Sequence, residues 1–345
     1  MDSQSLVSLE KLNPYLAANA PDVGQIVGAE KFSGGQSNPT FLITSDSGTQ
    51  YVLRRQPPGT LLKSAHAVDR EFKVISALQQ TPVPVPNAIH LCTDVDVLGA
   101  MFYIMEFKKG RIFWNSALPE ISNNEERSAM YDAMNKTMAD LHNVDIQAVG
   151  LSDYGKPGNY FARQLERWTK QYRAAETEHI EDMERLIKWL AQELPDDDGQ
   201  VSLVHGDFRM DNLMFADDSP SVIAVLDWEL STLGHPFADL AYQCMQLRLP
   251  SNMGHAPGLG GLDRHALGIP DEKAYIEAYC KRRGIEKIDN WPFYLAFSFF
   301  RLASIVQGVV KRSKMGNASN KQAASLEAMM RPLAAHAVTL IDEEQ

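Results

Sequence analysis

The apolar residues of this chain change their periodicity near residue 106, and this change limits the possible folds more than any other feature. Before it, short runs of β-branched and aromatic residues alternate with turn signals such as Ser33–Gly35 and Asp46–Gly48. After it, long segments with helical spacing follow one another. We therefore expect an α+β chain, with a small, mostly antiparallel β lobe at the N-terminus and a larger helical lobe at the C-terminus.

The same spacing predicts the individual elements. In the first lobe we expect strands at 25–32, 39–45, 50–54, 87–92 and 101–105, and helices at 5–19 and 67–78. In the second lobe we expect strands at 201–204 and 222–226, and helices at 122–142, 159–173, 178–193, 236–247, 271–283, 291–312 and 320–341. A capping-box pair, Ser122 and Glu125, is expected to begin the first of these helices.

Composition narrows the class of protein. The 345 residues include 33 Lys and Arg against 44 Asp and Glu, so the formal net charge is −11, which argues against a nucleic-acid partner. Three widely separated cysteines and the lack of a signal-peptide pattern lead us to expect a cytoplasmic protein without a disulfide framework. One apolar segment, 291–310, has Arg301 near its middle, so we expect a helix buried in the protein and no membrane partner.

The segment Val204–Asn212, VHGDFRMDN, has three polar residues in the spacing H-x-D-x-x-x-x-N. This is the spacing of the catalytic loop in protein kinases, with glycine in place of their arginine. Phosphoryl transfer needs a carboxylate that orients the acceptor hydroxyl and accepts its proton, and we assign this role to Asp207. It also needs an oxygen ligand for magnesium, which Asn212 would provide. His205 is expected to have a structural role.

A second predicted strand, 222–226, leads directly into Asp227. Kinases place a magnesium-binding aspartate at the end of the strand that follows the catalytic loop. Magnesium prefers hard oxygen ligands, which Asn212 and Asp227 would supply together with phosphate oxygens. A lone aspartate at a strand end is usually a turn residue. Combined with the first motif and the order of the lobes, however, Asp227 favours a phosphotransferase that uses ATP and Mg²⁺.

The first lobe offers candidates for nucleotide binding. The segment Phe32–Ile43 is expected to form a strand–loop–strand in which Gly34 and Gly35 let backbone amides approach phosphates. Arg54 occupies the place of the phosphate-binding lysine of kinases, and arginine can hold phosphate with two parallel hydrogen bonds. Glu71 is its candidate ion-pair partner. The alternative is an ordinary surface pair, which would contribute little.

Several segments together resemble the aminoglycoside phosphotransferase family, whose relatives include choline, homoserine and fructosamine kinases. These segments are SGGQSN, MEF, HGDFRMDN, LDWE and GHPFADLA. Four others, YVLRRQPPG, SAHAVDREF, STLGHPFADLA and GLGGLDRHALGIP, resemble the branch associated with acyl-CoA dehydrogenases. The resemblance implies a bilobal, protein-kinase-like fold, with a nucleotide-covering lobe at 1–106 and a catalytic and acceptor-binding lobe at 107–345.

The resemblance also implies roles for individual residues. It matches Asp207 to the catalytic base, and Asn212 and Asp227 to the metal ligands. Asp239 is expected to be structural, bonding the catalytic loop or capping a helix, and His235 stands where many members have aspartate. The residues expected to bind the nucleotide are Gly34, Gly35, Ser37, Asn38, Arg54, Glu71, Glu106 and Phe107, the last two as the hinge that meets adenine.

The acceptor is predicted to be a small molecule with a hydroxyl group. Resemblance to the dehydrogenase-associated branch favours a hydroxyacyl or hydroxy-acid compound, while amino sugars and amino alcohols remain alternatives. The glycine- and proline-rich segment 248–270 could cover this site, with His255, Arg264 and His265 as contacts for an anionic group. A flexible surface loop is the competing interpretation.

Two other functions are weighed against an active small-molecule kinase. A silent nucleotide-binding module that regulates a partner is suggested by Arg54, but the three residues Asp207, Asn212 and Asp227 argue against it. A protein kinase is disfavoured because no D-F-G to A-P-E activation segment is recognisable. The sequence indicates neither the oligomeric state nor the preference between ATP and GTP.

Overall fold

The computed structural model describes residues 6–32, 38–58, 66–252, 257–315 and 320–343. Contacts divide the chain into two compact units. The first contains residues 1–112, 147–151 and 212–231, and the second contains 113–146, 152–211 and 232–345. The first unit thus includes the segment Asn212–Ser231 in addition to the predicted N-terminal lobe. The lobe boundary at residues 106 and 107 stays a prediction.

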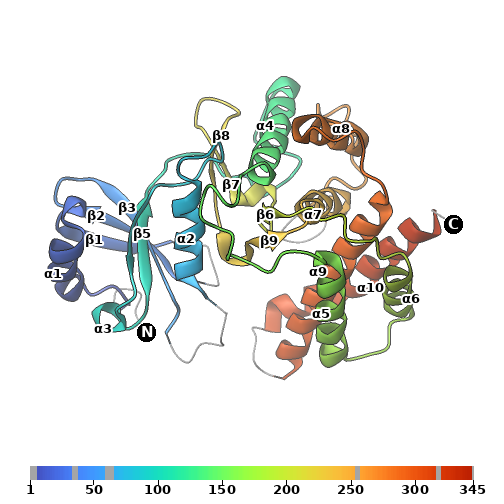
Figure 1. The fold of residues 1–345 in the computed structure, drawn as a ribbon, viewed down its shortest axis with the longest axis horizontal. Helices are drawn as coiled ribbons and strands as arrows, with labels where there is room; N and C mark the ends of the chain where they lie inside the picture. Colours follow the sequence, from blue (N-terminus) through green and yellow to red (C-terminus); the bar gives the residue numbers. More distant parts are fainter. Residues whose placement is uncertain (1–5, 33–37, 59–65, 253–256, 316–319, 344–345) are drawn as a thin grey trace. The chain divides into compact units, whose positions relative to one another are not determined.

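The first unit is built on one five-stranded antiparallel sheet (Figure 1). Alternation along the strands places Phe41 and Leu53 in the core with Leu16 of helix α1. Arg54 and Tyr103 are paired in register and point to the opposite face, where both contact Glu71 of α2. The sheet order is β1 (Ile26–Lys31), β2 (Thr40–Ser45), β3 (Gln50–Arg55), β5 (Phe102–Glu106) and β4 (Ala88–Cys92), with helices α1 (Leu9–Asn19), α2 (Val68–Leu78) and α3 (Val95–Leu98).

A short hairpin in the first unit carries one of the predicted site residues. Strands β7 (Leu213–Phe215) and β8 (Val222–Val225) pair antiparallel, and the amide of Val225 donates to the carbonyl of Pro84. Gly110 packs against this hairpin so closely that a Cβ there would lie 2.5 Å from the carbonyl oxygen of Phe215, so only glycine fits. Asp227 follows the end of β8 by two residues and directly precedes the 3₁₀ turn Trp228–Leu230.

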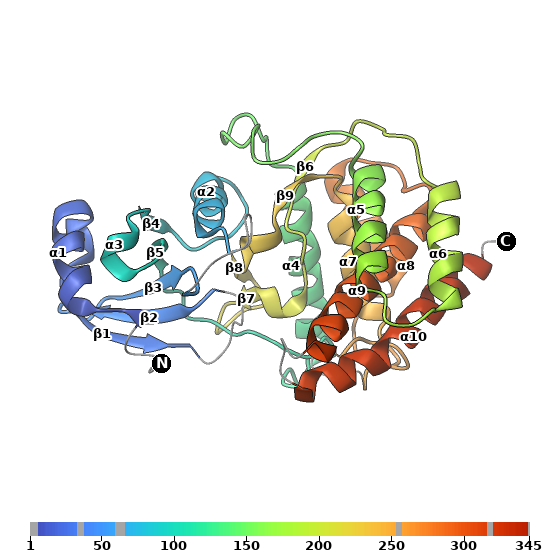
Figure 2. The same ribbon diagram turned by 90° about the horizontal axis from the view of Figure 1, so that it is seen from below.

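The second unit is predominantly helical (Figure 2). Among its described residues, one two-stranded antiparallel sheet pairs β6 (Ser202–Val204) with β9 (Thr232–Gly234), and β6 leads into the predicted catalytic loop. Helix α9 packs against α5, α7 and α10. The helices are α4 (Asn124–His142), α5 (Tyr160–Ala175), α6 (Glu181–Gln192), α7 (Phe237–Arg248), α8 (Glu272–Arg283), α9 (Trp291–Lys314) and α10 (Asn320–Asp342).

Helix α9 is the predicted apolar helix. Among the described residues it is the one helix long and apolar enough to cross a membrane, and 72% of its most apolar stretch is buried inside the protein. Phe297 and Phe293 of α9 pack against Phe161 of α5 with ring centroids 5.2 and 5.6 Å apart. The expectation of a helix buried in the protein is therefore confirmed.

The predicted elements match the structure closely, and the differences have local causes. Helix α4 is capped by Asn123, whose side chain accepts from the amide of Glu126, so the predicted Ser122–Glu125 box is wrong by one residue. The missed α-helix and strands, α3, β7 and β9, have only three or four residues each, and the 3₁₀ turns Pro21–Val23, Met210–Asn212 and Trp228–Leu230 were missed as well. Segments of that length carry no readable periodicity.

Candidate active site

The loop predicted to be catalytic is held by a buried carboxylate in the second unit. Asp239, in the first turn of α7, accepts a hydrogen bond from the amide of His205 at 2.6 Å and from the amide of Gly206 at 2.8 Å. Gly206 has φ +82°, a conformation that glycine adopts without strain. The expectation that Asp239 bonds the catalytic loop is confirmed, and these contacts fix the backbone directly before Asp207.

A second buried contact fixes Asp239 itself. The Nε2 atom of His142 lies 3.2 Å from Asp239, and its Nδ1 atom lies 2.6 Å from the hydroxyl of Tyr279. Burial lowers the pKa of His142 below its usual value of about 6.5, which favours the neutral ring at pH 7. Burial opposes ionisation of Asp239, but hydrogen bonds from His142 and the His205 amide outweigh it and hold the pKa of Asp239 below its usual range. An ionised Asp239 only accepts, so Nε2 of His142 donates and Nδ1 accepts from Tyr279.

Arg301 supports the catalytic loop from α9. Its Nη2 atom donates to the carbonyl of Gly206 at 2.7 Å, and its guanidinium lies 4.9 Å from the ring centroid of Tyr242. Burial, the charge of Asp207 and a hydrogen bond with that carboxylate raise the pKa of Tyr242. The amide of Asp207 donates to Nδ1 of His205 at 3.2 Å, which agrees with a structural role for His205. Asp207 is thus surrounded by groups that orient its backbone and its carboxylate.

One charged pair lies inside the loop. The Nε atom of Arg209 donates to Asp211 at 2.5 Å, and a second, parallel hydrogen bond joins Nη2 to the other carboxylate oxygen. Such a two-pronged pair restricts both side chains.

Arg301 could have been identified from the sequence, because an arginine in an apolar helix needs a partner. Tyr242 and His142 gave no comparable signal, because both lie in ordinary helical patterns.

The first unit brings four other predicted residues together. The Nη2 atom of Arg54 donates to Asp227 at 2.7 Å, and its Nε atom lies 2.8 Å from Glu71 in an ion-pair contact that is not an aligned hydrogen bond. Asn38 donates to Glu71 at 2.7 Å. The predicted partnership of Arg54 and Glu71 is therefore present, and it is buried rather than an ordinary surface pair.

Glu71 is the buried centre of this group. Besides Arg54 and Asn38, it accepts a hydrogen bond from the hydroxyl of Tyr103 at 3.2 Å. Burial raises the pKa of Glu71 to about 7, although the positive charge of Arg54 acts to lower it.

The backbone of Asp227 has φ +62° and ψ 63°, an uncommon conformation for an aspartate. Such local strain is common at functional sites.

The predicted metal ligands have suitable chemistry. The amide of Leu226 donates to the carbonyl of Asn212 at 2.9 Å, so the backbone pairing of the hairpin places Asn212 beside the residue that precedes Asp227. An amide oxygen and a carboxylate are hard donors of the kind that Mg²⁺ binds. The residues present therefore fit the ion, and their role as ligands stays a prediction.

The remaining nucleotide-binding predictions are only partly placed. Gly34, Gly35 and Ser37 lie outside the described residues. Glu106 ends β5, and its amide donates to the carbonyl of Asn87 at 2.9 Å. An adenine contact at this point would therefore use the carbonyl of Glu106 or the backbone of Phe107. Both hinge residues stay predictions.

The predicted acceptor loop contains one anchored arginine. Arg264 donates to the carbonyl of Leu247 at 3.0 Å and lines an open pocket of about 490 Å³. In the same pocket, Arg248 is already paired with Glu272 at 2.6 Å. His265 is exposed and His255 lies outside the described residues. Their predicted contacts with an anionic acceptor stay predictions.

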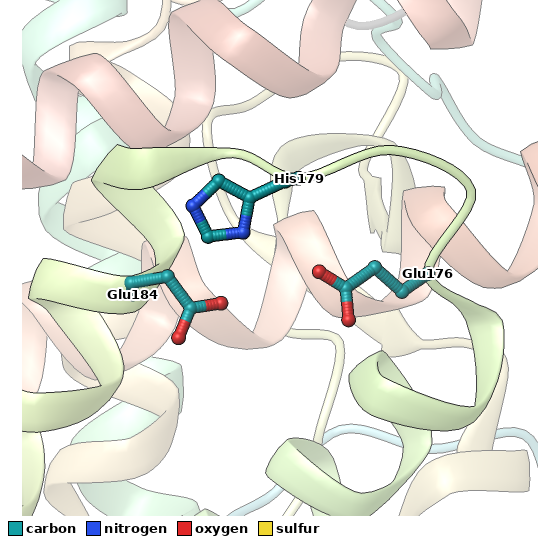
Figure 3. Close-up of side chains that lie close together, drawn as sticks. All are labelled: Glu176, His179 and Glu184. Atoms are coloured by element: carbon teal, nitrogen blue, oxygen red, sulfur yellow. The ribbon is translucent and has the colours of Figure 1, made fainter.

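A separate group of possible metal ligands lies between α5 and α6. Figure 3 shows Glu176, His179 and Glu184 with their side chains close together, and one ligand atom of each lies within 4.8 Å of the others. Arg173 already neutralises this group: its Nη2 donates to Glu184 at 2.6 Å, and its Nη1 lies 3.6 Å from Glu176. The hydrogen bond from Arg173 lowers the pKa of Glu184. We interpret the group as an ion-pair cluster at the surface, with His179 exposed and both glutamates half-buried.

The sequence is similar to known proteins over most of its length. The profile of a phosphotransferase enzyme family matches residues 28–288. Acyl-CoA dehydrogenase family member 10 of Mus musculus is 50% identical over 293 residues, which are 85% of this chain and 27% of that protein. Acyl-CoA dehydrogenase family member 11 of Homo sapiens is 42% identical over 96% of this chain and 42% of that protein. The chain therefore spans less than half the length of these relatives.

Solved structures agree with the fold. A protein of Ralstonia eutropha JMP134 assigned to the aminoglycoside phosphotransferases is 46% identical, with a TM-score of 0.89 over 97% of this chain and 98% of that one. Choline kinase from Cryptosporidium parvum Iowa II is 11% identical, with a TM-score of 0.65 over 97% of this chain and 96% of that one. At that identity the second match supports the fold alone. The predicted kinase-like fold is confirmed.

Proposed function

Because this chain belongs to the phosphotransferase enzyme family, the class of enzyme predicted from its sequence, we propose that it is an ATP- and magnesium-dependent kinase for the hydroxyl group of a small metabolite. The observation that carries the proposal is the fixed catalytic loop. Asp239 binds the amides of His205 and Gly206, and Arg301 binds the carbonyl of Gly206. A loop held from both sides is suited to presenting a carboxylate at a defined position.

Asp207 is the proposed base. In the transfer step, the acceptor oxygen forms a bond to the γ-phosphorus, and the bond from phosphorus to the β,γ-bridging oxygen breaks. The electron pair of that bond stays on ADP, and the acceptor proton moves to Asp207. A base in this position typically accelerates a reaction by a factor of about 10² to 10⁴.

The buried group of the first unit is the proposed nucleotide contact. Arg54 would bind phosphate oxygens through its terminal nitrogens, while Glu71 holds its Nε atom. The distance between this Nε atom and the Glu71 carboxylate is 2.8 Å. Asn212 and Asp227 would hold the magnesium ion, which neutralises phosphate charge when bound. Asn38 would act indirectly, because it donates to Glu71.

We propose a hydroxyacyl or hydroxy-acid compound as the acceptor. Support comes from the relatives, whose names associate them with acyl-CoA dehydrogenases, at 41% to 50% identity. Arg264 lines an open pocket in the segment predicted to contact an anionic group, and Arg248, Asp271, Glu272 and Glu343 line the same pocket. The net charge of −11 favours the alternative, a cationic amino sugar or amino alcohol, so the acceptor class needs a direct test.

A substrate screen tests the proposal. The purified chain is incubated with ATP, Mg²⁺ and a panel of hydroxy acids, hydroxyacyl thioesters, amino alcohols and amino sugars, and ADP release and product mass are measured. We expect a product 80 Da heavier than one acidic acceptor, a gain that corresponds to one phosphoryl group. The Asp217→Asn variant, which changes an exposed carboxylate in the β7–β8 turn, should be as active as wild type. Turnover with cationic acceptors alone would refute the acceptor class. Nucleotide binding without turnover of any acceptor would favour the silent module.

A further inference from the structure

Arg54 makes contacts that a phosphate-binding role alone does not explain. Its Nη2 atom lies 2.7 Å from Asp227 and 3.8 Å from Glu229, while Nε lies 2.8 Å from Glu71. Its side chain is 13% exposed, and that of Asp227 is 38% exposed. One guanidinium thus faces three carboxylates, one of which is the proposed ligand of the metal.

We infer that Arg54 is the internal counter-ion of the metal site: it neutralises Asp227 when no metal is bound, and moves to the phosphates when a nucleotide enters. The inference rests on the proposed function, because a polyphosphate is the anion that would draw Arg54 away. Arginine has five N–H donors in a planar fork. The side chain can therefore keep Nε toward Glu71 while Nη2 exchanges Asp227 for a phosphate oxygen.

The contacts of Asp227 imply an order of binding. A divalent cation that arrives alone must displace the guanidinium of Arg54 from Asp227 or share the carboxylate with it. If they share it, the two positive charges lie close together and repel each other. A nucleotide supplies the replacement anion for Arg54, so metal and nucleotide should bind together. Arg54 would therefore weaken binding of the free metal and strengthen binding of the nucleotide.

The opposite signs of these two effects make the inference testable. If Arg54 only grips phosphate, its removal lowers the affinity for nucleotide and leaves the affinity for free metal unchanged. If it also neutralises Asp227, its removal raises the affinity for free metal. A hydrogen bond to a charged group changes an equilibrium by about tenfold, so we expect an effect of that size.

Manganese is a suitable probe, because it binds the same oxygen donors as magnesium and is detected by electron paramagnetic resonance. Dissociation constants for Mn²⁺ are measured without nucleotide, and for ADP in the presence of Mg²⁺. Arg54→Gln should bind Mn²⁺ about tenfold more tightly than wild type and ADP more weakly. Adding Asp227→Asn to this variant should remove the gain.

Two further variants keep the test decisive. Arg70→Gln removes the same charge from helix α2, which also carries Glu71. The side chain of Arg70 is exposed, so this variant should change Mn²⁺ affinity less than about twofold. Arg54→Gln could fail to fold because Glu71 loses its charged partner. In that case the double variant Arg54→Gln with Glu71→Gln, in which both buried side chains are neutral, is used in its place.

The outcome separates the inference from the proposed function. Unchanged or weaker Mn²⁺ binding in the Arg54 variants would overturn the counter-ion role, even if the wild-type chain turns over ATP. Tighter Mn²⁺ binding in a chain that neither binds ADP nor turns over ATP would support the pairing with Asp227, and would refute the proposed kinase activity and the nucleotide-driven exchange.

Discussion

Replacement of Asp239 by asparagine should destabilise the second unit and impair the catalytic loop together. The side chain is fully buried and accepts two backbone hydrogen bonds, at 2.6 and 2.8 Å, besides its contact with His142. Asparagine has nearly the same shape, but one of its two terminal atoms is a donor. In Asp239, Oδ1 accepts from the Gly206 amide, and Oδ2 accepts from the His205 amide and also faces His142. The donor therefore meets a loop amide in either orientation, and at least one loop amide loses its partner.

The magnitude follows from these contacts. A hydrogen bond to a charged group contributes about 1.5–3 kcal/mol, and a buried donor left without a partner costs about 1–3 kcal/mol. A neutral asparagine still forms some of the bonds, so we expect Asp239→Asn to lower the free energy of unfolding by about 3 kcal/mol. Turnover should fall as well, because the two amides directly precede Asp207.

Urea unfolding at pH 7, followed by tryptophan fluorescence and by circular dichroism, measures this loss. The control is Asp140→Asn, which breaks a solvent-exposed pair with Lys136 on α4 and should change stability by less than about 0.5 kcal/mol. A loss below about 1 kcal/mol for Asp239→Asn, with normal turnover, would refute the argument that this carboxylate holds the loop.

The pH dependence has a definite sign. The pKa of Asp239 is lower in the folded protein than the value of about 3.9 in an unfolded chain. Its contribution is therefore fully present above pH of about 4 and is lost as the pH falls through the lower, folded pKa. The difference in stability between wild type and Asp239→Asn should be constant between pH 7 and 8, and the contribution of the Asp239 carboxylate should be lost only in strong acid. Below pH of about 6.5 the difference also includes His142, because burial lowers the pKa of that ring and the charge of Asp239 acts to raise it.

Two other substitutions follow from the same account. Asp227→Ala should abolish magnesium-dependent binding of ATP in calorimetry, because the phosphate charge loses the ion that neutralises it, and unchanged affinity would contradict the metal role. Arg264→Ala should raise the KM for an anionic acceptor several-fold and leave the KM for ATP unchanged, since the contact lies away from the transferred phosphoryl group. A cationic best acceptor would contradict that assignment.

The sequence predicted the order of elements well because most of them are long and strongly periodic. It predicted the catalytic loop because three residue types in fixed spacing carry a chemical meaning. It could not predict that Asp239 contacts His142, which lies 97 residues away, or that His142 contacts Tyr279, which lies 137 residues away. Such contacts depend on how α4, α7 and α8 pack, and each side chain alone fits an ordinary helix.

The pairing of Arg54 with Asp227 was equally hidden. The sequence showed an arginine in a lysine position and suggested Glu71 as its partner, which the 2.8 Å contact confirms. The contact with Asp227 spans 173 residues. It forms because β3 and the β7–β8 hairpin belong to one compact unit, although the hairpin is distant in the chain.

The Asp207→Asn variant tests the central claim most directly. Equilibrium binding of ATP in the presence of Mg²⁺ and turnover with the best acceptor are measured on the same preparation. The proposed role as base predicts a fall in kcat of about 10² to 10⁴, with the dissociation constant for ATP changed less than about threefold. Near-normal turnover in this variant would contradict the assignment of Asp207 and, with it, the proposed mechanism.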